Sequence, residues 1–529
     1  MRAWFTKHPS VRVSLPALLL GGLILVLYGS FLVHRINLTV SDLGRHLQNG
    51  REALAHRAIH AANFYSYTHP DEPVVNHHLG SGAVLFLAWK AGGFAGVHVL
   101  FTAVGLATLA LFFLAAARAA GPGPAALIAV LAIPLLAERT EIRPEAVSYL
   151  FAAVFFLLLM RFEKIHDWRW LAVLPFLQAI WVNMHIYFFL GPVLIAIFLM
   201  AGILVRPGDR KRVAALAYAA LASAAASLLN PFFLKGAMAP FRIFENYGYR
   251  VAENQPVWFV ETLLQNPNFT IFKILFLILT LSFAARLWIG RGRGGAAGAP
   301  AFAPFALVGL MVSAMAWMAT RNFALFGFFF IPLVATNLSA CCGPWLARRR
   351  RETEIGATIL VSLLIVPALF GQWQRYFPYW KEPGLGLERG NGDAAAFFLA
   401  RKLRGPIFNN YDIGGYLIWH LFPQEKVFVD NRPEAYPAAF FRDTYIPMQE
   451  QDDAWRQALR QWQFNTIFFS HRDMTPWAQQ FLMARVQDRE WAPVYADRYA
   501  IIFLRRNEDN KETIDRFEIP QSAFQVVKR

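Results

Sequence analysis

The sequence is short of cysteine and of charge. Of its 529 residues only two are cysteines, and they are adjacent, at Cys341 and Cys342. That spacing excludes a disulfide framework and a C-x-x-C metal or redox site. Charged residues make up only 16% of the chain and hydrophobic residues 56%, which is far from the balance of a soluble domain. The composition therefore indicates a membrane protein with several spans.

Acidic residues are also scarce, with 35 against 51 basic ones and a formal net charge of +16. A basic balance can indicate nucleic-acid binding, but only where Lys and Arg gather in one patch. Here they are distributed over short stretches between apolar runs. We therefore predict no nucleic-acid partner and look for the membrane as the reason for the charge.

Apolar runs of about 20 residues, the length of a membrane-spanning helix, recur along the first two thirds of the chain. About eleven can be counted, so the expected fold class is mostly α, a polytopic membrane helix bundle. The runs are residues 13–34, 95–117, 123–138, 144–161, 169–185, 187–205, 213–229, 271–289, 302–319, 322–341 and 355–372.

The distribution of Lys and Arg orients this bundle, because cytoplasmic loops carry an excess of basic residues. If the N-terminus is cytoplasmic, the inside loops hold most of them, including Arg348–Arg351. The short outside turns then hold only Arg139, Arg143 and Arg321. An odd number of spans places the C-terminus outside. We expect a multi-pass membrane protein with its N-terminus in the cytoplasm and its C-terminal domain outside, which in a bacterial inner membrane is the periplasm.

Two outside segments, residues 35–94 and 230–270, belong to the membrane domain, which we assign to residues 1–372. In the first of them, Leu43 and the apolar residues after it recur at helical spacing beside charged ones. This pattern predicts an amphipathic helix at the membrane surface. The apolar stretch 83–89 is too short to span and predicts a second surface helix.

Residues 373–529 form a separate C-terminal domain, in which short apolar runs alternate with helical stretches. Such alternation is typical of an α/β domain with parallel strands. We expect strands at 406–409, 426–430 and 466–469, a closing hairpin from 494–499 and 501–504, and helices near 391–404, 412–421, 450–462 and 475–488.

Polar residues at the outside ends of the spans define the candidate site. Asp42 follows the first span in the run Ser41-Asp42-Leu43-Gly44-Arg45-His46, and a carboxylate at the mouth of an apolar bundle is costly to place and suited to chemistry. Guanidinium groups bind phosphate oxygens, and a carboxylate accepts a hydroxyl proton. The combination favours a phosphate carried on a lipid and a neutral polyol. The candidate substrate-binding residues are Arg45, His46, His77, His78, Arg143, Glu145, His185 and Arg321.

Each candidate also has a structural alternative. Asp42 could cap the helix that follows it. Arg143 and Glu145 could simply form an ion pair, and His185 could be a core histidine bonded to a backbone carbonyl. His46, His77 and His78 resemble a metal-ligand set by residue type, but they show no fixed ligand spacing, so we expect no zinc site there. A divalent cation stays open as a cofactor.

Several short motifs resemble the bacterial GT-C-type membrane glycosyltransferases of the dolichyl-phosphate-mannose mannosyltransferase-like superfamily. The likeness covers nearly the whole chain, although each motif is short. The motifs are residues 42–46 (Asp-Leu-Gly-Arg-His), 63–68 (Asn-Phe-Tyr-Ser-Tyr-Thr), 76–79 (Asn-His-His-Leu), 143–145 (Arg-Pro-Glu), 181–185 (Trp-Val-Asn-Met-His), 408–419 and 427–432.

This resemblance implies an inverting transfer of a sugar from a polyprenyl-phosphate donor, held among membrane lipids, to a hydroxyl of a glycan, lipid or protein on the periplasmic side. Asp42 would be the catalytic carboxylate, acting as general base. Several members show two adjacent acidic residues in the first loop, whereas Asp42 is flanked by Ser41 and Leu43, which argues against metal coordination there.

Two other function classes stay open. A transporter or flippase of lipid-linked saccharides would use the same basic cavity but is expected to show inverted repeats and broken helices. A non-catalytic envelope assembly protein would keep the soluble domain without the first-loop carboxylate.

Overall fold

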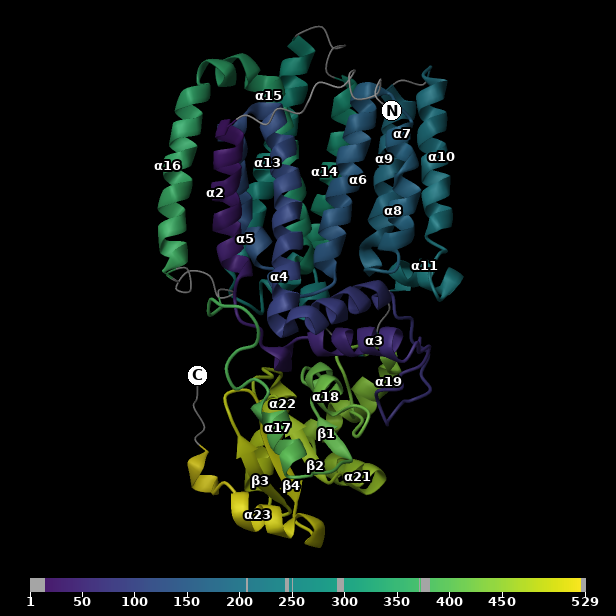
Figure 1. The fold of residues 1–529 in the computed structure, drawn as a ribbon, viewed down its shortest axis with the longest axis vertical. Coiled ribbons are helices and arrows are strands. Elements are labelled where there is room, and N and C mark those ends of the chain that lie inside the picture. Colours follow the sequence, from purple (N-terminus) through teal and green to yellow (C-terminus); the bar gives the residue numbers. More distant parts are fainter. Residues whose placement is uncertain are drawn as a thin grey trace.

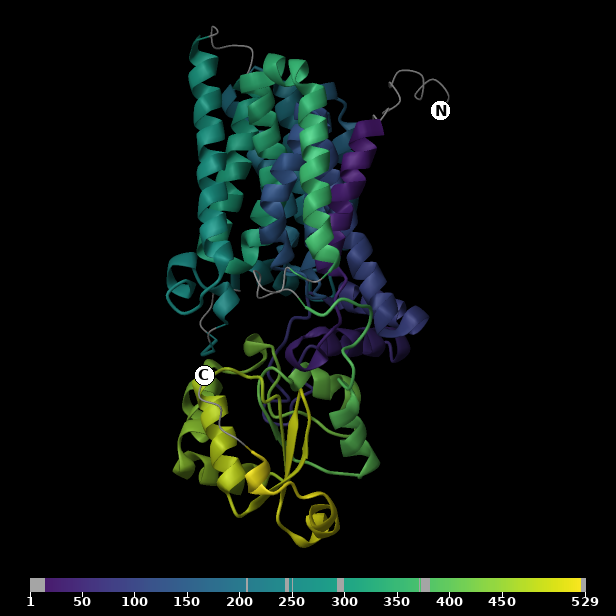
Figure 2. The ribbon, with the colours of Figure 1, turned by 90° about the vertical axis from the view of Figure 1, so that its left-hand side faces the viewer.

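The computed structural model describes residues 15–205, 208–242, 247–249, 251–292, 299–370, 372 and 381–524. It consists of a bundle of long helices and, beyond one end of the bundle, a smaller domain built on a sheet (Figure 1). A view turned by a quarter shows the same two layers, with the first outside segment between them (Figure 2). The expected fold class is confirmed.

Each of the expected spans falls on a helix or a pair of helices. Among the described residues, seven helices are long and apolar enough to cross a membrane, so the count of about eleven stays a prediction. The bundle comprises α2 (Leu15–Leu32), α4 (Leu79–Ala120), α5 (Pro122–Ala137), α6 (Glu145–Ile165), α7 (Arg169–Ala172), α8 (Leu174–Trp181), η2 (Ile186–Phe189), α9 (Leu190–Val205), α10 (Arg210–Ala226), α13 (Pro267–Gly292), α14 (Ala299–Met318), α15 (Phe323–Arg348) and α16 (Arg350–Leu369).

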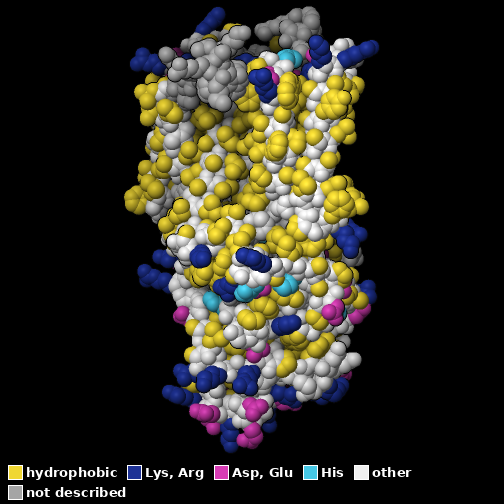
Figure 3. All heavy atoms as spheres, turned by 45° about the vertical axis from the view of Figure 1, so that its right-hand side comes forward, with side chains coloured by type: hydrophobic (Ala, Val, Ile, Leu, Met, Phe, Trp, Pro, Cys, Tyr) yellow, Lys and Arg dark blue, Asp and Glu magenta, His cyan; other side chains and the backbone are white. Residues whose placement is uncertain are grey.

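The outer surface of the bundle is apolar. Hydrophobic side chains cover its flank, while charged side chains lie at its two ends and on the domain beyond (Figure 3). Leu18, Leu277 and Leu363 are each more than half exposed. A surface of this kind is unfavourable in water but matches lipid, in which helices satisfy their own backbone groups. The chain is therefore a membrane protein.

The first outside segment contains η1 (Leu38–Val40) and then α3 (Leu43–Ala55), which lies across the end of the bundle (Figure 1). α4 follows, and its helix is interrupted at Gly92 and Gly93, where Gly93 has a φ of +58°. Glycine adopts this conformation without the cost that a Cβ would add. The kink separates a short first part, which includes the predicted surface helix at 83–89, from the part that enters the bundle.

The C-terminal domain lies at the opposite end of the bundle from the turn between α15 and α16, which carries Arg348–Arg351 (Figure 1). This arrangement agrees with the charge asymmetry used to orient the chain. Of the basic residues assigned to inside loops, Arg2, Lys7, Arg12, Arg206 and Arg293 lie outside the described residues.

The domain's sheet has the strand order β1-β2-β4-β3. β1 (Ile407–Asn409) pairs in parallel with β2 (Thr466–Phe469), whereas β4 (Ile501–Arg505) is antiparallel to both β2 and β3 (Trp491–Ala496). The predicted hairpin is thus confirmed. The flanking helices are α17 (Asp393–Ala400), α18 (Gly414–Leu421), α21 (Asp452–Trp462), α22 (Pro476–Gln487) and α23 (Lys511–Phe517).

The predicted strand at 426–430 is wrong. In this segment only Val427 forms a bridge, and its partner is Ser66 of the first outside segment rather than a strand of the sheet. The neighbouring backbone groups of Phe428 bond to side chains: its N–H donates to Asn409 Oδ1, and its carbonyl accepts from the Ser66 hydroxyl. The segment therefore connects the domain to the first outside segment.

A close contact between two glycines fixes the domain against α3. A Cβ on Gly44 of α3 would overlap the carbonyl oxygen of Gly415 at the start of α18, and one on Gly415 would lie 3.1 Å from the carbonyl oxygen of Ser41. Arg432 adds a second link, because its Nη2 donates to Asn63 Oδ1 at 2.6 Å. The start of α18 is consequently held beside Asp42, the residue that follows Ser41.

Candidate active site

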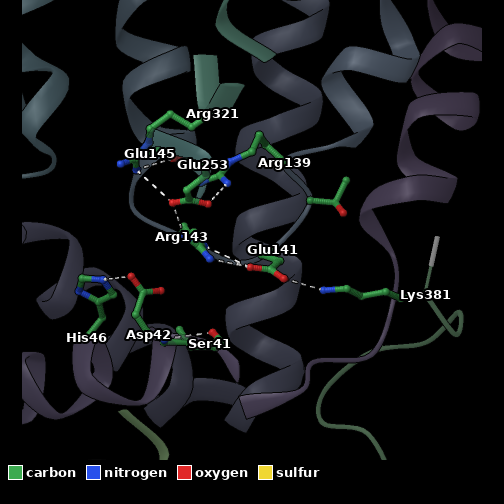
Figure 4. Close-up of polar contacts among 12 residues, drawn as sticks. Ser41, Asp42, His46, Arg139, Glu141, Arg143, Glu145, Glu253, Arg321 and Lys381 are labelled. Carbon is green, nitrogen blue, oxygen red and sulfur yellow. Dashed lines mark hydrogen bonds and ion pairs between the residues drawn. The ribbon is translucent and has the colours of Figure 1, made fainter. Parts of the chain in front are cut away.

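Asp42 precedes α3 at the level where the bundle meets the C-terminal domain (Figure 4). Its side chain makes no capping hydrogen bond, and the N–H of Leu43 donates to Ser41 Oγ. One carboxylate oxygen, Oδ2, lies 3.3 Å from His46 Nε2 and 3.6 Å from Arg45 Nη2. The other, Oδ1, has no hydrogen-bond partner among the described residues. Capping alone thus does not account for this carboxylate.

The charges around Asp42 keep it ionised. Burial opposes ionisation, but His46, Arg143 and Arg45 outweigh it and hold the pKa of the Asp42 carboxyl well below its usual range. Burial and Arg45 in turn lower the pKa of His46. Asp42 is therefore a fixed negative charge at neutral pH, and its Oδ2 lies within hydrogen-bond distance of the His46 imidazole.

Three arginines from separate parts of the chain converge on Glu253, which comes from η3 (Ala252–Asn254) in the second outside segment (Figure 4). Arg139 Nη1 lies 2.5 Å from Glu253 Oε2, and Arg143 Nη1 lies 3.0 Å from Glu253 Oε1. Arg321 Nη2 is 4.0 Å from the same Oε1. These cations hold the pKa of the Glu253 carboxyl well below its usual range despite its burial.

Two further carboxylates complete this group. Glu145 bridges Arg139 and Arg321, at 2.5 and 3.2 Å. Glu141 bridges Arg143 and Lys381, at 2.9 and 3.0 Å. Burial alone would raise the pKa of Glu141, but Lys381 and Arg143 lower this pKa to about 2. We call these seven residues, Arg139, Glu141, Arg143, Glu145, Glu253, Arg321 and Lys381, the arginine cluster.

The arginine cluster is nearly balanced in charge, because three carboxylates pair with its three guanidinium groups and one ammonium group. Two of its guanidinium nitrogens, Arg139 Nη2 and Arg321 Nε, are buried without a hydrogen-bond partner among the described residues. Such groups are costly when unsatisfied. They are therefore candidates to donate to a ligand oxygen.

Four histidine rings form a cluster next to Asp42, in which His78 contacts each of the other three. The ring centres of His46 and His78 are 5.0 Å apart, those of His77 and His78 4.1 Å, and those of His78 and His185 5.1 Å. Burial lowers the pKa of His77 to about 4 and that of His78 well below its usual range. The rings of His77 and His78 are thus neutral, and they offer hydrogen bonds rather than charge.

His185 is anchored by its surroundings. Its Nδ1 accepts from the backbone N–H of Tyr187 at 3.3 Å and lies 2.9 Å from Ser148 Oγ, which itself accepts from Trp181 Nε1 at 2.8 Å. Two donors at Nδ1 place the proton of the neutral ring on Nε2. The predicted carbonyl partner is replaced by this hydroxyl network.

All the predicted site residues lie at this end of the bundle, in two groups. Asp42, Arg45 and His46 share one group with the other histidines, while Arg143, Glu145 and Arg321 belong to the arginine cluster. Glu253 and Lys381 were not predicted. Glu253 lies in a polar run within the second outside segment. A carboxylate at the expected level of the site could have suggested it as a site residue. Nothing in the sequence, however, showed that this segment folds back onto the arginines.

A metal does not fit these residues well. Among the described residues, no group of three or more His, Cys, Asp or Glu side chains is arranged to hold a metal ion. The immediate neighbours of Asp42 are a guanidinium and an imidazole rather than a second carboxylate. We derive no step through a metal.

Comparison with known proteins gives a fold but no sequence family, since neither a protein-family profile nor a curated protein sequence matches the chain. Among solved structures, the archaeal oligosaccharyltransferase AglB from Archaeoglobus fulgidus, in complex with an inhibitory peptide and a dolichol-phosphate, aligns with a TM-score of 0.60 and 11% identity over 93% of this chain and 73% of that one. The same oligosaccharyltransferase in complex with Zn and sulfate aligns with a TM-score of 0.56 and 11% identity over the same shares of the two chains.

A second solved protein has a similar fold over nearly its whole length. ArnT from Cupriavidus metallidurans, bound to undecaprenyl phosphate, aligns with a TM-score of 0.53 and 13% identity over 95% of this chain and 99% of that one. At such identities the likeness establishes the fold alone. The chain therefore has the GT-C fold, a membrane helix bundle followed by a C-terminal domain on one side.

Proposed function

We propose that this protein is an inverting glycosyltransferase that moves a sugar from a polyprenyl-phosphate donor to an acceptor hydroxyl on the periplasmic side of the membrane. One observation carries the proposal: three arginines converge at the end of the bundle that faces the C-terminal domain, and one of them, Arg143, lies near Asp42. Solved proteins of the same fold hold a dolichol-phosphate and an undecaprenyl phosphate, which supports a lipid-linked donor.

The arginine cluster would bind the donor phosphate. Guanidinium groups match phosphate oxygens in geometry and charge, and Arg139, Arg143 and Arg321 already converge on one carboxylate. A phosphate that enters here takes the place of the Glu253 carboxylate. The arginines would then stabilise the negative charge that gathers on the phosphate when the sugar leaves.

Asp42 would stabilise the positive charge that develops on the sugar. As the bond to phosphate breaks, the anomeric carbon becomes positively charged, and a fixed carboxylate beside it stabilises that charge. A hydroxyl that attacks from the face opposite the phosphate inverts the configuration. Arg45, His46, His77, His78 and His185 would contact the substrate's polar groups, and Arg45 also reaches the C-terminal domain through Asn431 Oδ1, at 3.2 Å.

Binding of undecaprenyl phosphate tests the donor site. The change Arg321→Gln keeps a donor group but removes the charge, and we expect about tenfold weaker binding, because one charge-assisted hydrogen bond contributes roughly 1.5 kcal/mol or more. The measurement is equilibrium binding of fluorescent undecaprenyl phosphate to the purified protein in phosphatidylcholine nanodiscs. Arg442→Gln, on the exposed surface of the C-terminal domain, is the control. Unchanged affinity in both Arg321→Gln and Arg143→Gln would place the phosphate elsewhere.

The orientation is tested separately with reporter fusions. Alkaline phosphatase fused after Lys381, beyond the last span, is expected to be active, because the enzyme folds only outside the cytoplasm. The same reporter fused after Arg349, in the turn between α15 and α16, is expected to be inactive. The reverse pattern would place Asp42 on the cytoplasmic side and exclude a periplasmic reaction.

A further inference from the structure

The loop between β1 and α18 brings a second carboxylate to the site. Its backbone is fixed on both sides: Tyr411 N–H donates to the Tyr445 hydroxyl at 2.8 Å, and Asn410 Nδ2 donates to Asp473 Oδ2 at 2.9 Å. Asp412 lies between these anchors and α18, and its own carboxylate makes no hydrogen bond or ion pair with any described residue. A half-buried carboxylate on a rigid loop without a partner is available to a ligand.

The packing of α18 places this loop beside Asp42. A Cβ on Gly415 would lie 3.5 Å from the Cα of Asp42, and Gly415 is only three residues beyond Asp412. Because both residues at the α3–α18 contact, Gly44 and Gly415, are glycines, no side chain separates the two helices there. The C-terminal domain thereby brings Asp412 to the edge of the site, within electrostatic range of Arg143 and Glu141.

The groups that face Asp412 come from three other parts of the chain. Asp473 lies in the loop after β2, Arg143 and Glu141 lie between α5 and α6, and Tyr249 lies in the second outside segment. Burial, then Asp473 and more weakly Glu141, raise the pKa of the Asp412 carboxyl to about 7, although Arg143 lowers it. Arg143 influences Asp42 as well, so the two carboxylates have a common neighbour but opposite properties.

This difference decides which of the two can act as a base. A general base works best when its pKa is close to the working pH, and a strongly acidic carboxyl such as Asp42 takes up a proton poorly. The proton of an acceptor hydroxyl needs a carboxylate that is ionised before the reaction and holds the proton after it. Asp412, without a hydrogen-bond partner among the described residues and with a pKa of about 7, meets this requirement.

We propose that Asp412 is the general base of the transfer and that Asp42 remains ionised throughout. The hydroxyl oxygen of the acceptor forms a bond to the anomeric carbon and gives its proton to Asp412. The bond between that carbon and the phosphate oxygen breaks, and its electron pair leaves with the polyprenyl phosphate. The acceptor hydroxyl would therefore bind beside the loop before α18, on the side where Arg143 and Glu141 lie. This inference rests on the proposed glycosyl transfer.

The pH dependence of transfer tests it. With glycerol as the acceptor hydroxyl and a panel of labelled polyprenyl-phosphate hexoses as donors, the rate of the unaltered protein should rise about tenfold from pH 6 to pH 8, as a carboxyl of pKa about 7 loses its proton. Asp412→Asn should reduce transfer about a hundredfold at pH 8 and remove this rise, while Asp412→Glu should restore part of both. Asp453→Asn, an exposed carboxylate of the same domain, is the control.

Binding of undecaprenyl phosphate separates the possible failures. Asp412→Asn should bind this lipid within about twofold of the unaltered protein, which shows that the variant is folded and that the donor site is intact. If the unaltered protein transfers sugar and Asp412→Asn keeps both its rate and its pH profile, the role of Asp412 is refuted and the glycosyl transfer stands. If the unaltered protein transfers no sugar from any donor, both proposals fail.

Discussion

Asp42→Asn is expected to reduce sugar transfer by about a hundredfold or more, the scale on which loss of one preorganised charge or catalytic group lowers an enzyme's rate. Asparagine has nearly the same shape and can still accept a hydrogen bond from His46, but it cannot provide the negative charge. Because the pKa of Asp42 lies well below its usual range, the loss should be the same from pH 6 to pH 8. Initial rates with labelled polyprenyl-phosphate hexoses give the comparison.

The matched control changes the residue before it. Ser41→Ala removes the hydroxyl that accepts from the N–H of Leu43, so it weakens the start of α3 by about 1 kcal/mol without touching the carboxylate. We expect this variant to lose thermal stability but little activity. Equal losses in Ser41→Ala and Asp42→Asn would show that the helix start matters and that the charge of Asp42 does not.

The sequence predicted the fold well because long apolar runs have few structural solutions. A run such as 144–161 must be a helix in lipid, since no other single segment satisfies its own backbone groups there. The segment 426–430 has the composition of a strand, yet its partner is Ser66, more than 350 residues earlier in the chain. A local pattern cannot identify a partner at that distance, so this strand was wrongly predicted.

The site was predicted only in part, because the sequence shows the ends of the spans but not the tertiary contacts between them. Span ends show which residues share a level, and this placed Asp42, Arg143 and Arg321 together. Which charges pair is decided by tertiary contacts, as the position of Glu253 among the arginines shows. The properties of a carboxylate also depend on its surroundings: two aspartates, Asp42 and Asp412, are opposite in acidity for reasons that no sequence pattern displays.

Glu253→Gln is expected to strengthen the binding of undecaprenyl phosphate by about a hundredfold. If the phosphate must take the place of this carboxylate, binding begins with the loss of its hydrogen bonds to Arg139 and Arg143. Two such bonds at about 1.5 kcal/mol each sum to about 3 kcal/mol, roughly two orders of magnitude in affinity. Glutamine still fills the space but no longer competes as an anion. The measurement is the same binding titration in nanodiscs.

The expected gain in affinity should come with a loss of stability in the absence of the lipid. Without its carboxylate the arginine cluster carries uncompensated positive charge, which destabilises a buried site. Undecaprenyl phosphate should then raise the Tm of Glu253→Gln by more than it raises that of the unaltered protein, because tighter binding stabilises the folded state further at the same lipid concentration. Glu261 lies in the same outside segment as Glu253 and forms an ion pair with Lys273 of α13, and Glu261→Gln should change neither quantity by as much. Weaker lipid binding by Glu253→Gln would mean that Glu253 holds the arginines in place for the phosphate instead of occupying its position.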